Sequence, residues 1–510
     1  MKRTFTFAAA ALALCTFQSS AQAQAQPQAA RQAPIAAVAP SQFVTAPQLP
    51  LQRFTLDNGL EVIVHEDHRS PAVTVNVWYH VGSKDEPRGR NGFAHLFEHL
   101  MFQGSRHVPE DKFFEILESI GATSVNGTTG DDRTNYFETV PRSRLATALW
   151  LESDRMGFLL DHVDQRTFEN QREVVLNEYR QNYENAPYGA VWRILREAVF
   201  PQGHPYHRLA IGTPQDLAAA TLDDVRRFFR TFYVPNNATL VLAGDITLAD
   251  ARTMVTQYFG PIPRGPQPPR REPGPARPLA LQHLDVEASV ELPRVVIAWQ
   301  TPRYFAPGDA ELDVIGNLLS NGQSSRLFRR LVRQEQVAVD VSAFQNSMEL
   351  ASMFVITATL RPNQSHAAVR DAIDEELATL VQTPVQLPEF DRARYDLTTS
   401  LIFGIEAMSN RADRFNLYRQ HVGDPDYLAR DVARYLTPTP ATISSNVGAL
   451  LPSDHRVTLF VHPVADAPVA GRLRAPDPSA ARARLAFGET VDEGALRRPN
   501  SPSAPAGGAQ

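Results

Sequence analysis

Cysteine is almost missing from this chain of 510 residues. Its single cysteine, Cys15, lies in an N-terminal segment that we expect to be removed on export. A mature chain without cysteine has no disulfide framework, no catalytic thiolate and no zinc site built on sulfur. Any metal that the protein binds must therefore be held by histidine, aspartate or glutamate.

An excess of positive charge and long apolar runs are missing as well. The formal net charge is -6, so there is no basic surplus to neutralise the phosphates of a nucleic acid. Beyond the N-terminal segment, no apolar run approaches the roughly 20 residues of a membrane-spanning helix. The composition thus predicts no nucleic-acid partner and no membrane span for the mature chain.

The N-terminus has the pattern of a secretory signal. Two basic residues precede an apolar run over residues 5–17, and small residues stand at Ala21 and Ala23, the positions that a signal peptidase reads. We predict a signal peptide over residues 1–23 and export, most simply to the periplasm. The next residues, 24–48, are rich in alanine, glutamine and proline, and we expect them to form a disordered tether.

The rest of the chain divides at residues 261–278, a segment with eight prolines that we predict to be a linker. Strand patterns precede grouped helical patterns on both sides of it, an order typical of α+β folds. We therefore predict two similar α+β domains. Their expected bounds are 49–260 for a catalytic domain and 279–465 for a domain without a zinc motif, followed by a disordered tail over 466–510.

The most informative segment is a predicted helix between Asn91, a candidate N-cap, and Gly104. At 100° per residue, His95, Glu98 and His99 share one face, opposite an apolar face of phenylalanine and leucine. A merely solvated face is the alternative interpretation, but such faces usually carry lysine and glutamate rather than paired histidines.

Two histidines one helical turn apart can hold one tetrahedral metal ion. A third protein ligand would then leave the fourth position open for water, which is the arrangement of a catalytic site. Glu98 lies on the same face but offset, where it would accept a proton from the attacking water. The order His-x-x-Glu-His is the inverzincin signature.

A third ligand should be a carboxylate on another element. The helical pattern near residues 167–183 offers Glu169, Glu173 and Glu178. Spacing alone does not choose among these three, and a glutamate on a helix is more often a surface residue than a ligand.

The segments His95-Leu-Phe-Glu98-His99 and Arg172-Glu-Val-Val-Leu-Asn-Glu178 resemble the pitrilysin-type zinc metallopeptidases, in particular bacterial two-domain members related to mitochondrial processing peptidase. His204-Pro-Tyr-His and Gly322-Gln-Ser-Ser-Arg are also similar to family segments. The resemblance implies that Glu178 is the third ligand of one zinc ion per chain. It also implies that each domain is a mostly antiparallel sheet with helices packed on one face.

The resemblance further implies a zinc-dependent endopeptidase that hydrolyses peptides or unfolded polypeptide segments, with Glu98 as general base. The family grips substrate and stabilises the oxyanion with an arginine and a tyrosine seven residues apart, a spacing that Arg411 and Tyr418 share, although Arg414 is a nearby alternative. Substrate would add as a strand beside Asn126 and Thr128. A plain polar turn is the alternative interpretation of that last segment.

The partners expected from the resemblance are peptide substrates and a second subunit. Single-chain relatives enclose substrate in four such domains, whereas this sequence supplies two, so we expect a homodimer or a heterodimer with a related chain. Arg411 and Tyr418 would then act either in their own chain or on the other subunit's zinc. The alternative function is that of a noncatalytic assembly or peptide-binding subunit, which the complete set of His95, Glu98, His99 and Glu178 argues against.

Overall fold

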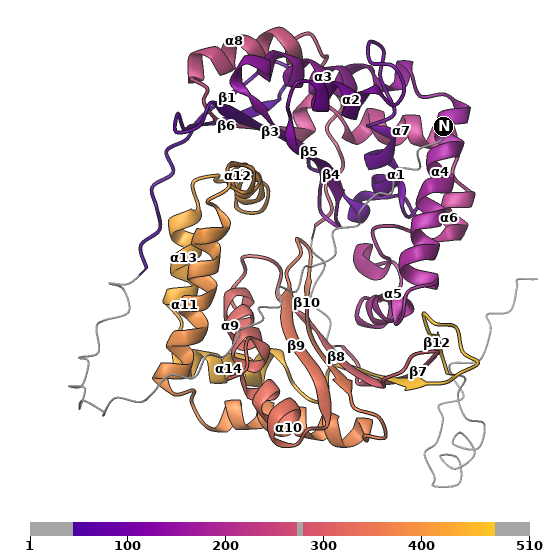
Figure 1. Cartoon of the computed structure of the whole chain (residues 1–510), viewed down its shortest axis with the longest axis vertical. Helices are drawn as coiled ribbons and strands as arrows, with labels where there is room; N and C mark the ends of the chain where they lie inside the picture. Colours follow the sequence, from indigo (N-terminus) through magenta and orange to yellow (C-terminus); the bar gives the residue numbers. More distant parts are fainter. Residues whose placement is uncertain (1–43, 273–278, 475–510) are drawn as a thin grey trace, which may run out of the picture.

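The computed structural model describes residues 44–272 and 279–474 of the chain. The predicted signal peptide, most of the predicted tether, the end of the linker and most of the tail lie outside these residues. Two six-stranded sheets, each with its own helices, form two similar halves (Figure 1). The predicted fold class, α+β with two similar and mostly antiparallel domains, is therefore confirmed.

The sheet of the first half has the strand order β1-β2-β6-β3-β5-β4, and its one parallel pair is β2 with β6. Its strands are β1 (Gln52–Thr55), β2 (Glu61–Glu66), β3 (Ala72–Tyr79), β4 (Thr123–Thr129), β5 (Thr134–Pro141) and β6 (Ala238–Gly244). The strands β1 and β2 pair antiparallel and form a hairpin about Gly59. The strand β4 lies at one edge of the sheet.

The helices of the first half come mostly after its first strands. They are α1 (Phe93–Leu100), α2 (Lys112–Ser119), α3 (Leu145–Phe158), α4 (Gln165–Tyr179), α5 (Gly189–Val199), α6 (Pro214–Ala218), α7 (Leu222–Phe232) and α8 (Leu248–Phe259). Valines that alternate along the strands, among them Val62, Val75 and Val77, are fully buried and pack against apolar residues of α1, α3 and α7. This core fixes α1 beneath the sheet.

The second half repeats this plan with the strand order β12-β7-β11-β8-β10-β9. Its strands are β7 (Gln282–Ala288), β8 (Arg294–Thr301), β9 (Ala338–Asn346), β10 (Ser352–Leu360), β11 (Val457–Pro463) and β12 (Arg472–Leu473). Its helices are α9 (Asp309–Ser320), α10 (His366–Gln382), α11 (Leu387–Gly404), α12 (Met408–Val422), α13 (Leu428–Leu436) and α14 (Pro440–Leu450). No described helix is long and apolar enough to cross a membrane.

One helix of each half packs on the sheet of the other half. The helix α12 covers the face of the first sheet that its own helices leave open, where Phe415 packs with Ile63 and Val241 (Figure 1). In return, α5 covers the second sheet, where Ile194 packs in one cluster with Val296. The apolar residues on the second face of each sheet are thereby buried, and the two halves are held together.

Two segments that we predicted to be disordered are partly ordered. Residues 44–48, which we assigned to the tether, place Val44 and Ala46 against the apolar cluster around Tyr418. Residues 466–474, which we assigned to the tail, bury Ala467 and extend the second sheet through the pairing of β12 with β7. Composition predicted disorder here because it does not reveal the tertiary contacts that a few apolar residues make.

Candidate metal centre

The helix α1 begins differently from our prediction. Its N-cap is Gly92, whose positive φ of 98° suits glycine, and Asn91 instead turns its side chain to the Asp216 carboxylate. The buried Glu86 carboxylate accepts hydrogen bonds from the backbone amides of Gly92 (2.9 Å) and Ala94 (2.8 Å). The cap therefore comes from a loop residue, which satisfies amides that a helix start leaves unpaired.

The apolar face of α1 holds the helix in place. Phe97 is fully buried, and its ring centroid lies 5.4 Å from that of Phe228 and 5.0 Å from that of Tyr233. The opposite face carries His95, Glu98 and His99, as the helical period predicts. Core packing thus fixes the direction in which these three polar side chains point.

His95 and His99 meet Glu178 from the facing helix α4. The Glu178 Oε2 atom lies 3.5 Å from His95 Nε2 and 3.6 Å from His99 Nε2, and one donor atom from each of the three residues lies within 4.8 Å of the others. Two ligands of a tetrahedral zinc ion, each about 2.0–2.1 Å from it, lie roughly 3.3–3.5 Å apart. The three donors therefore fit a small tetrahedral cation.

The structure separates Glu178 from the two other glutamates that spacing left open. Glu169 is exposed and accepts a hydrogen bond from Gln165 at 2.7 Å, and Glu173 is also exposed. Among the residues described, the group of His95, His99 and Glu178 is the one cluster of histidine, cysteine and acidic side chains with metal-site geometry.

The protonation states of this group also suit a metal. Burial and, to a smaller extent, the neighbouring His99 lower the pKa of His95 to about 4, so His95 is neutral near pH 7. His99 and His95 lower the pKa of Glu178, which is therefore ionised. The Nδ1 atom of His95 is buried without a hydrogen-bond partner in the described structure. Neutral imidazoles and a carboxylate are the ligand forms that zinc takes.

Glu98 lies on the same helical face but outside the donor cluster. Burial raises the pKa of its carboxyl group, and the Thr129 hydroxyl, His99 and Arg133 oppose that rise. A carboxylate whose pKa is shifted upward toward the working pH is suited to take up and release a proton. Its chemistry thus differs from that of Glu178, whose pKa is shifted downward.

The edge strand β4 passes directly beside Glu98. A Cβ atom added at Gly127 would lie 3.1 Å from Glu98 Cγ and 2.9 Å from the Phe102 ring, so only glycine allows this approach. Because β4 is an edge strand, its outer backbone groups have no partner strand in the described part of the sheet. An extended peptide paired with β4 would run past Glu98.

The two residues that we predicted to bind substrate on β4 have different surroundings. Asn126 is exposed, and its side-chain oxygen accepts a hydrogen bond from Gly127 N at 2.9 Å. Thr128 is half-buried and donates to Asn135 Oδ1 at 2.5 Å. Of the two side chains, that of Asn126 is the more accessible.

Arg411 and Tyr418 do not join the donor cluster within this chain. Arg411 is buried, with its guanidinium 2.8 Å from Asp67 Oδ2, and Tyr418 is fully buried and donates to Asp431 Oδ2 at 2.8 Å. Both contacts stabilise the packing of α12 and its neighbours. The role that we predicted for Arg411 and Tyr418 in gripping substrate stays a prediction, and it would require both to leave these partners.

Sequence reasoning missed two residues that shape the site. Glu86 caps α1 from outside the helix, and Arg133 donates to the Thr128 backbone oxygen at 2.8 Å while its charge acts on Glu98. Neither lies at a fixed spacing from the motif. No signal in the sequence could have identified them, because both contacts arise from tertiary packing.

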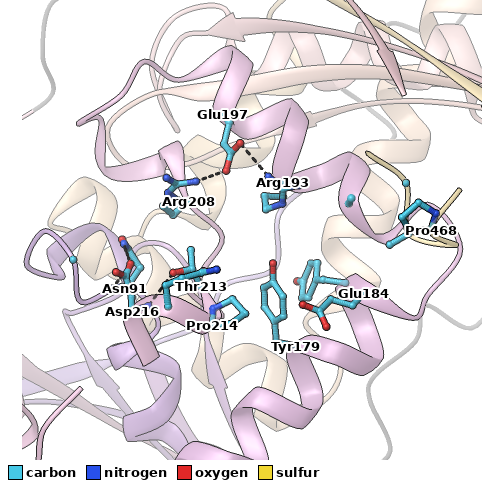
Figure 2. Close-up of a pocket in the computed structure, with 16 residues that line it drawn as sticks. Asn91, Tyr179, Glu184, Arg193, Glu197, Arg208, Thr213, Pro214, Asp216 and Pro468 are labelled. Atoms are coloured by element: carbon cyan, nitrogen blue, oxygen red, sulfur yellow. Dashed lines mark hydrogen bonds and ion pairs between the residues drawn. The ribbon is translucent and has the colours of Figure 1, made fainter. Parts of the chain in front are cut away.

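Two cavities that share lining residues lie outside the donor cluster. The first, of about 810 Å³, is lined by Tyr179, the residue after the donor Glu178, and is shown in Figure 2. The second, of about 460 Å³, shares Gly89, Asn91 and Arg208 with the first. The donors themselves line neither cavity and are partly open, with 17%, 11% and 32% of the side chains of His95, His99 and Glu178 exposed.

Comparison with protein families divides the chain into two matches. Residues 61–209 match the family described as Insulinase (Peptidase family M16), and residues 219–397 match that described as Peptidase M16 inactive domain. Together these matches cover more than half of the chain. All the donors and Glu98 lie in the first match.

Individual relatives agree with these matches. A zinc protease of Helicobacter pylori, PqqE, is 29% identical over 374 residues, which are 71% of this chain and 82% of that protein. A crystal structure of a protease from Helicobacter pylori is similar with a TM-score of 0.76 at 24% identity, and covers 82% of this chain and 100% of that chain. The crystal structure of the first half of the periplasmic protease PqqL from Escherichia coli is similar with a TM-score of 0.67 at 20% identity. The similarity covers 84% of this chain and 94% of that chain.

Proposed function

The chain belongs to peptidase family M16, and from this premise we propose that it is a zinc-dependent endopeptidase acting on peptides or unfolded polypeptide segments. One observation carries the proposal: two histidine nitrogens and one carboxylate oxygen converge at tetrahedral spacing, 3.5 and 3.6 Å apart. His95, His99 and Glu178 would hold one zinc ion, with Glu98 beside it. The first half is then the catalytic domain, and the second half is a noncatalytic domain.

Bound zinc supplies Lewis acidity, which polarises a peptide carbonyl and favours ionisation of a water molecule. Glu98 takes the proton of the attacking water on its carboxylate and gives it to the nitrogen of the leaving amine. The raised pKa of Glu98 favours both transfers, since burial makes its ionised form a better proton acceptor. The hydroxyl of Thr129 orients the Glu98 carboxylate by hydrogen bonding.

The edge strand β4 would position the substrate. Its backbone offers hydrogen bonds to any extended peptide, which suits broad sequence tolerance, and Asn126 would add a side-chain contact. A folded protein cannot present an extended strand at this edge, so unfolded segments and peptides are the expected substrates.

Location and assembly belong to the same proposal. The N-terminal pattern and the similarity to half of a periplasmic protease support a periplasmic peptidase. A homodimer, or a heterodimer with a related chain, would enclose the substrate, since one chain leaves the donors partly open.

The test is hydrolysis of a quenched peptide library by the purified mature chain, with metal content measured in parallel. Glu98→Gln should lower the rate by about a thousandfold, within the range that a general base contributes, while about one zinc per chain remains bound. Glu173→Gln, an exposed change on α4, is the matched control and should keep full activity.

Absence of zinc from the wild-type chain would overturn the proposal, as would full activity in Glu98→Gln. Zinc without hydrolysis would favour the noncatalytic or peptide-binding subunit, which a related second chain would have to complete.

A further inference from the structure

The two cavities carry charged groups that the proposed reaction does not use. In the first cavity, Glu197 accepts from Arg193 at 3.2 Å with one carboxylate oxygen and from Arg208 with the other (Figure 2). Figure 2 also shows the Tyr179 hydroxyl directed into the space below this pair. One carboxylate therefore holds two guanidinium groups in place, and each keeps further N–H donors beyond that bond.

The second cavity is cationic. Among the described residues that line it, Glu86 is the one carboxylate, and it is fully engaged with the backbone amides at the start of α1. Lys84 is buried and ion-paired with Asp85 at 2.7 Å. Glu86 and Lys84 are therefore both already engaged by partners within the protein.

Two further cations of the second cavity, Arg88 and Arg271, lack acidic partners among the described residues. Within residues 44–272 and 279–474, neither Arg88 nor Arg271 forms an ion pair with a carboxylate, and Arg271 donates only to the Glu86 backbone oxygen at 3.1 Å. His204 accepts from Tyr206 N through Nδ1, which leaves Nε2 as its donor nitrogen. Unpaired arginines around a concave surface focus a positive potential that attracts anions.

The helix α4 contributes to both the metal centre and the first cavity. Tyr179, which lines the first cavity, directly follows the donor Glu178 on α4, and Arg208 lines both cavities. The scissile bond and the second cavity would therefore be contacted by different residues of one extended peptide.

We propose that the second cavity binds a carboxylate of the peptide substrate, either an acidic side chain or the C-terminal carboxylate, through Arg88 and Arg271. Guanidinium groups pair with carboxylates in a two-bonded geometry, which favours this ligand class over neutral amides. The site thereby selects acidic substrates. This inference rests on the proposed peptidase activity, since it names the substrate class of that site.

The experiment compares two quenched peptides with one common core. In one, acidic residues are placed several positions from the scissile bond, scanned on both sides, and in the other the same positions carry the corresponding amides. At low ionic strength the wild type should cleave the better acidic peptide with about a tenfold lower KM and a similar kcat, the size expected for a charge-assisted pair that is partly solvated.

Removal of both unpaired arginines should abolish this preference. In Arg88→Gln combined with Arg271→Gln, the two peptides should differ by less than about twofold. The control is Arg53→Gln combined with Arg230→Gln, two exposed arginines that line neither cavity, and it should keep the preference although it loses the same charge. Reversal to Arg88→Glu with Arg271→Glu should turn the preference toward a lysine-containing peptide.

Equal cleavage of both peptides by the wild type would overturn the inference and leave the proposed peptidase intact. An equal loss in the control pair would also overturn it, because a general field would then be responsible. If no peptide is cleaved, the proposed function fails, and fluorescence anisotropy of the same peptides on the Glu98→Gln protein decides the inference. Equal affinities in that assay, with protection against unfolding by inorganic phosphate, would indicate a free-anion site and contradict it.

Discussion

The first α-helices of the two halves carry polar residues at the same spacing but with different surroundings. In α1, His95 and His99 lie four residues apart, and their Nε2 atoms face Glu178 Oε2 at 3.5 and 3.6 Å. In α9, Asp309 and Asp313 also lie four residues apart. The spacing is shared, so it is not spacing alone that distinguishes a metal centre from a structural network.

The two aspartates of α9 are paired with protein partners. Asp309, which is fully buried, lies 2.7 Å from an Arg434 nitrogen and accepts from Ser347 at 2.6 Å, and Asp313 accepts from the Tyr435 hydroxyl at 2.9 Å. Burial raises the pKa of Asp313 to about 7. Buried carboxylates that accept hydrogen bonds from protein donors are typical of a structural role.

The two histidines of α1 have a different arrangement. The buried Nδ1 of His95 has no hydrogen-bond partner in the described structure, and the distances from Glu178 Oε2 to the two Nε2 atoms fit a shared cation. The difference indicates that donor atoms from two helices that converge at metal-ligand spacing form a ligand site, whereas the same residue spacing with protein hydrogen-bond partners forms a structural contact.

The largest expected effect comes from removing one of the three metal-donor residues of the first half. Glu178→Gln should abolish zinc binding at micromolar zinc and lower peptide hydrolysis by at least about a thousandfold, because two histidines alone do not complete the site. Metal analysis after dialysis and a peptide assay measure both effects. Glu173→Gln, exposed on the same helix, should change neither, and zinc retention in Glu178→Gln would contradict the ligand assignment.

A substitution in the second half should have the opposite signature. Asp309→Asn leaves Arg434 with a weakened buried ion pair and should lower the free energy of unfolding by about 3 kcal/mol, with zinc content unchanged. Urea unfolding and metal analysis check the two parts. Asp340→Asn, an exposed change in β9, serves as control. Loss of zinc in a still-folded Asp309→Asn protein would show that the halves are not chemically separate.

The smallest expected effect concerns the cost of burying Glu98. The pKa of Glu98 is higher in the folded state than in the unfolded state. The Glu98 carboxyl group therefore costs no stability below its unfolded-state pKa, and it lowers the free energy of unfolding as the pH rises through its folded-state pKa. In metal-free protein, Glu98→Gln should therefore raise the free energy of unfolding by about 1 kcal/mol at pH 8 and change it little at pH 4. Urea unfolding at both pH values measures the difference. An equal gain at pH 4 and pH 8 would assign the effect to packing rather than charge.

Part of the site could be predicted because it is local. The helical period alone places His95, Glu98 and His99 on one face of one helix, and the alternation of apolar residues identified most strands of both sheets. These patterns depend on residues close in sequence, so no knowledge of the fold was needed. The family resemblance then named Glu178, and the structure places it with the two histidines.

The remaining features depend on contacts between distant residues. The cap of α1 by Glu86, the approach of Gly127 to Glu98 and the ion pair between Arg411 and Asp67 have no fixed spacing in the sequence. The exchange of α5 and α12 between the halves is likewise invisible to periodicity, which shows that a face is apolar but not what covers it. The sequence by itself determined the chemical groups and their helical face, and tertiary packing decided which carboxylate, which strand and which arginines meet them.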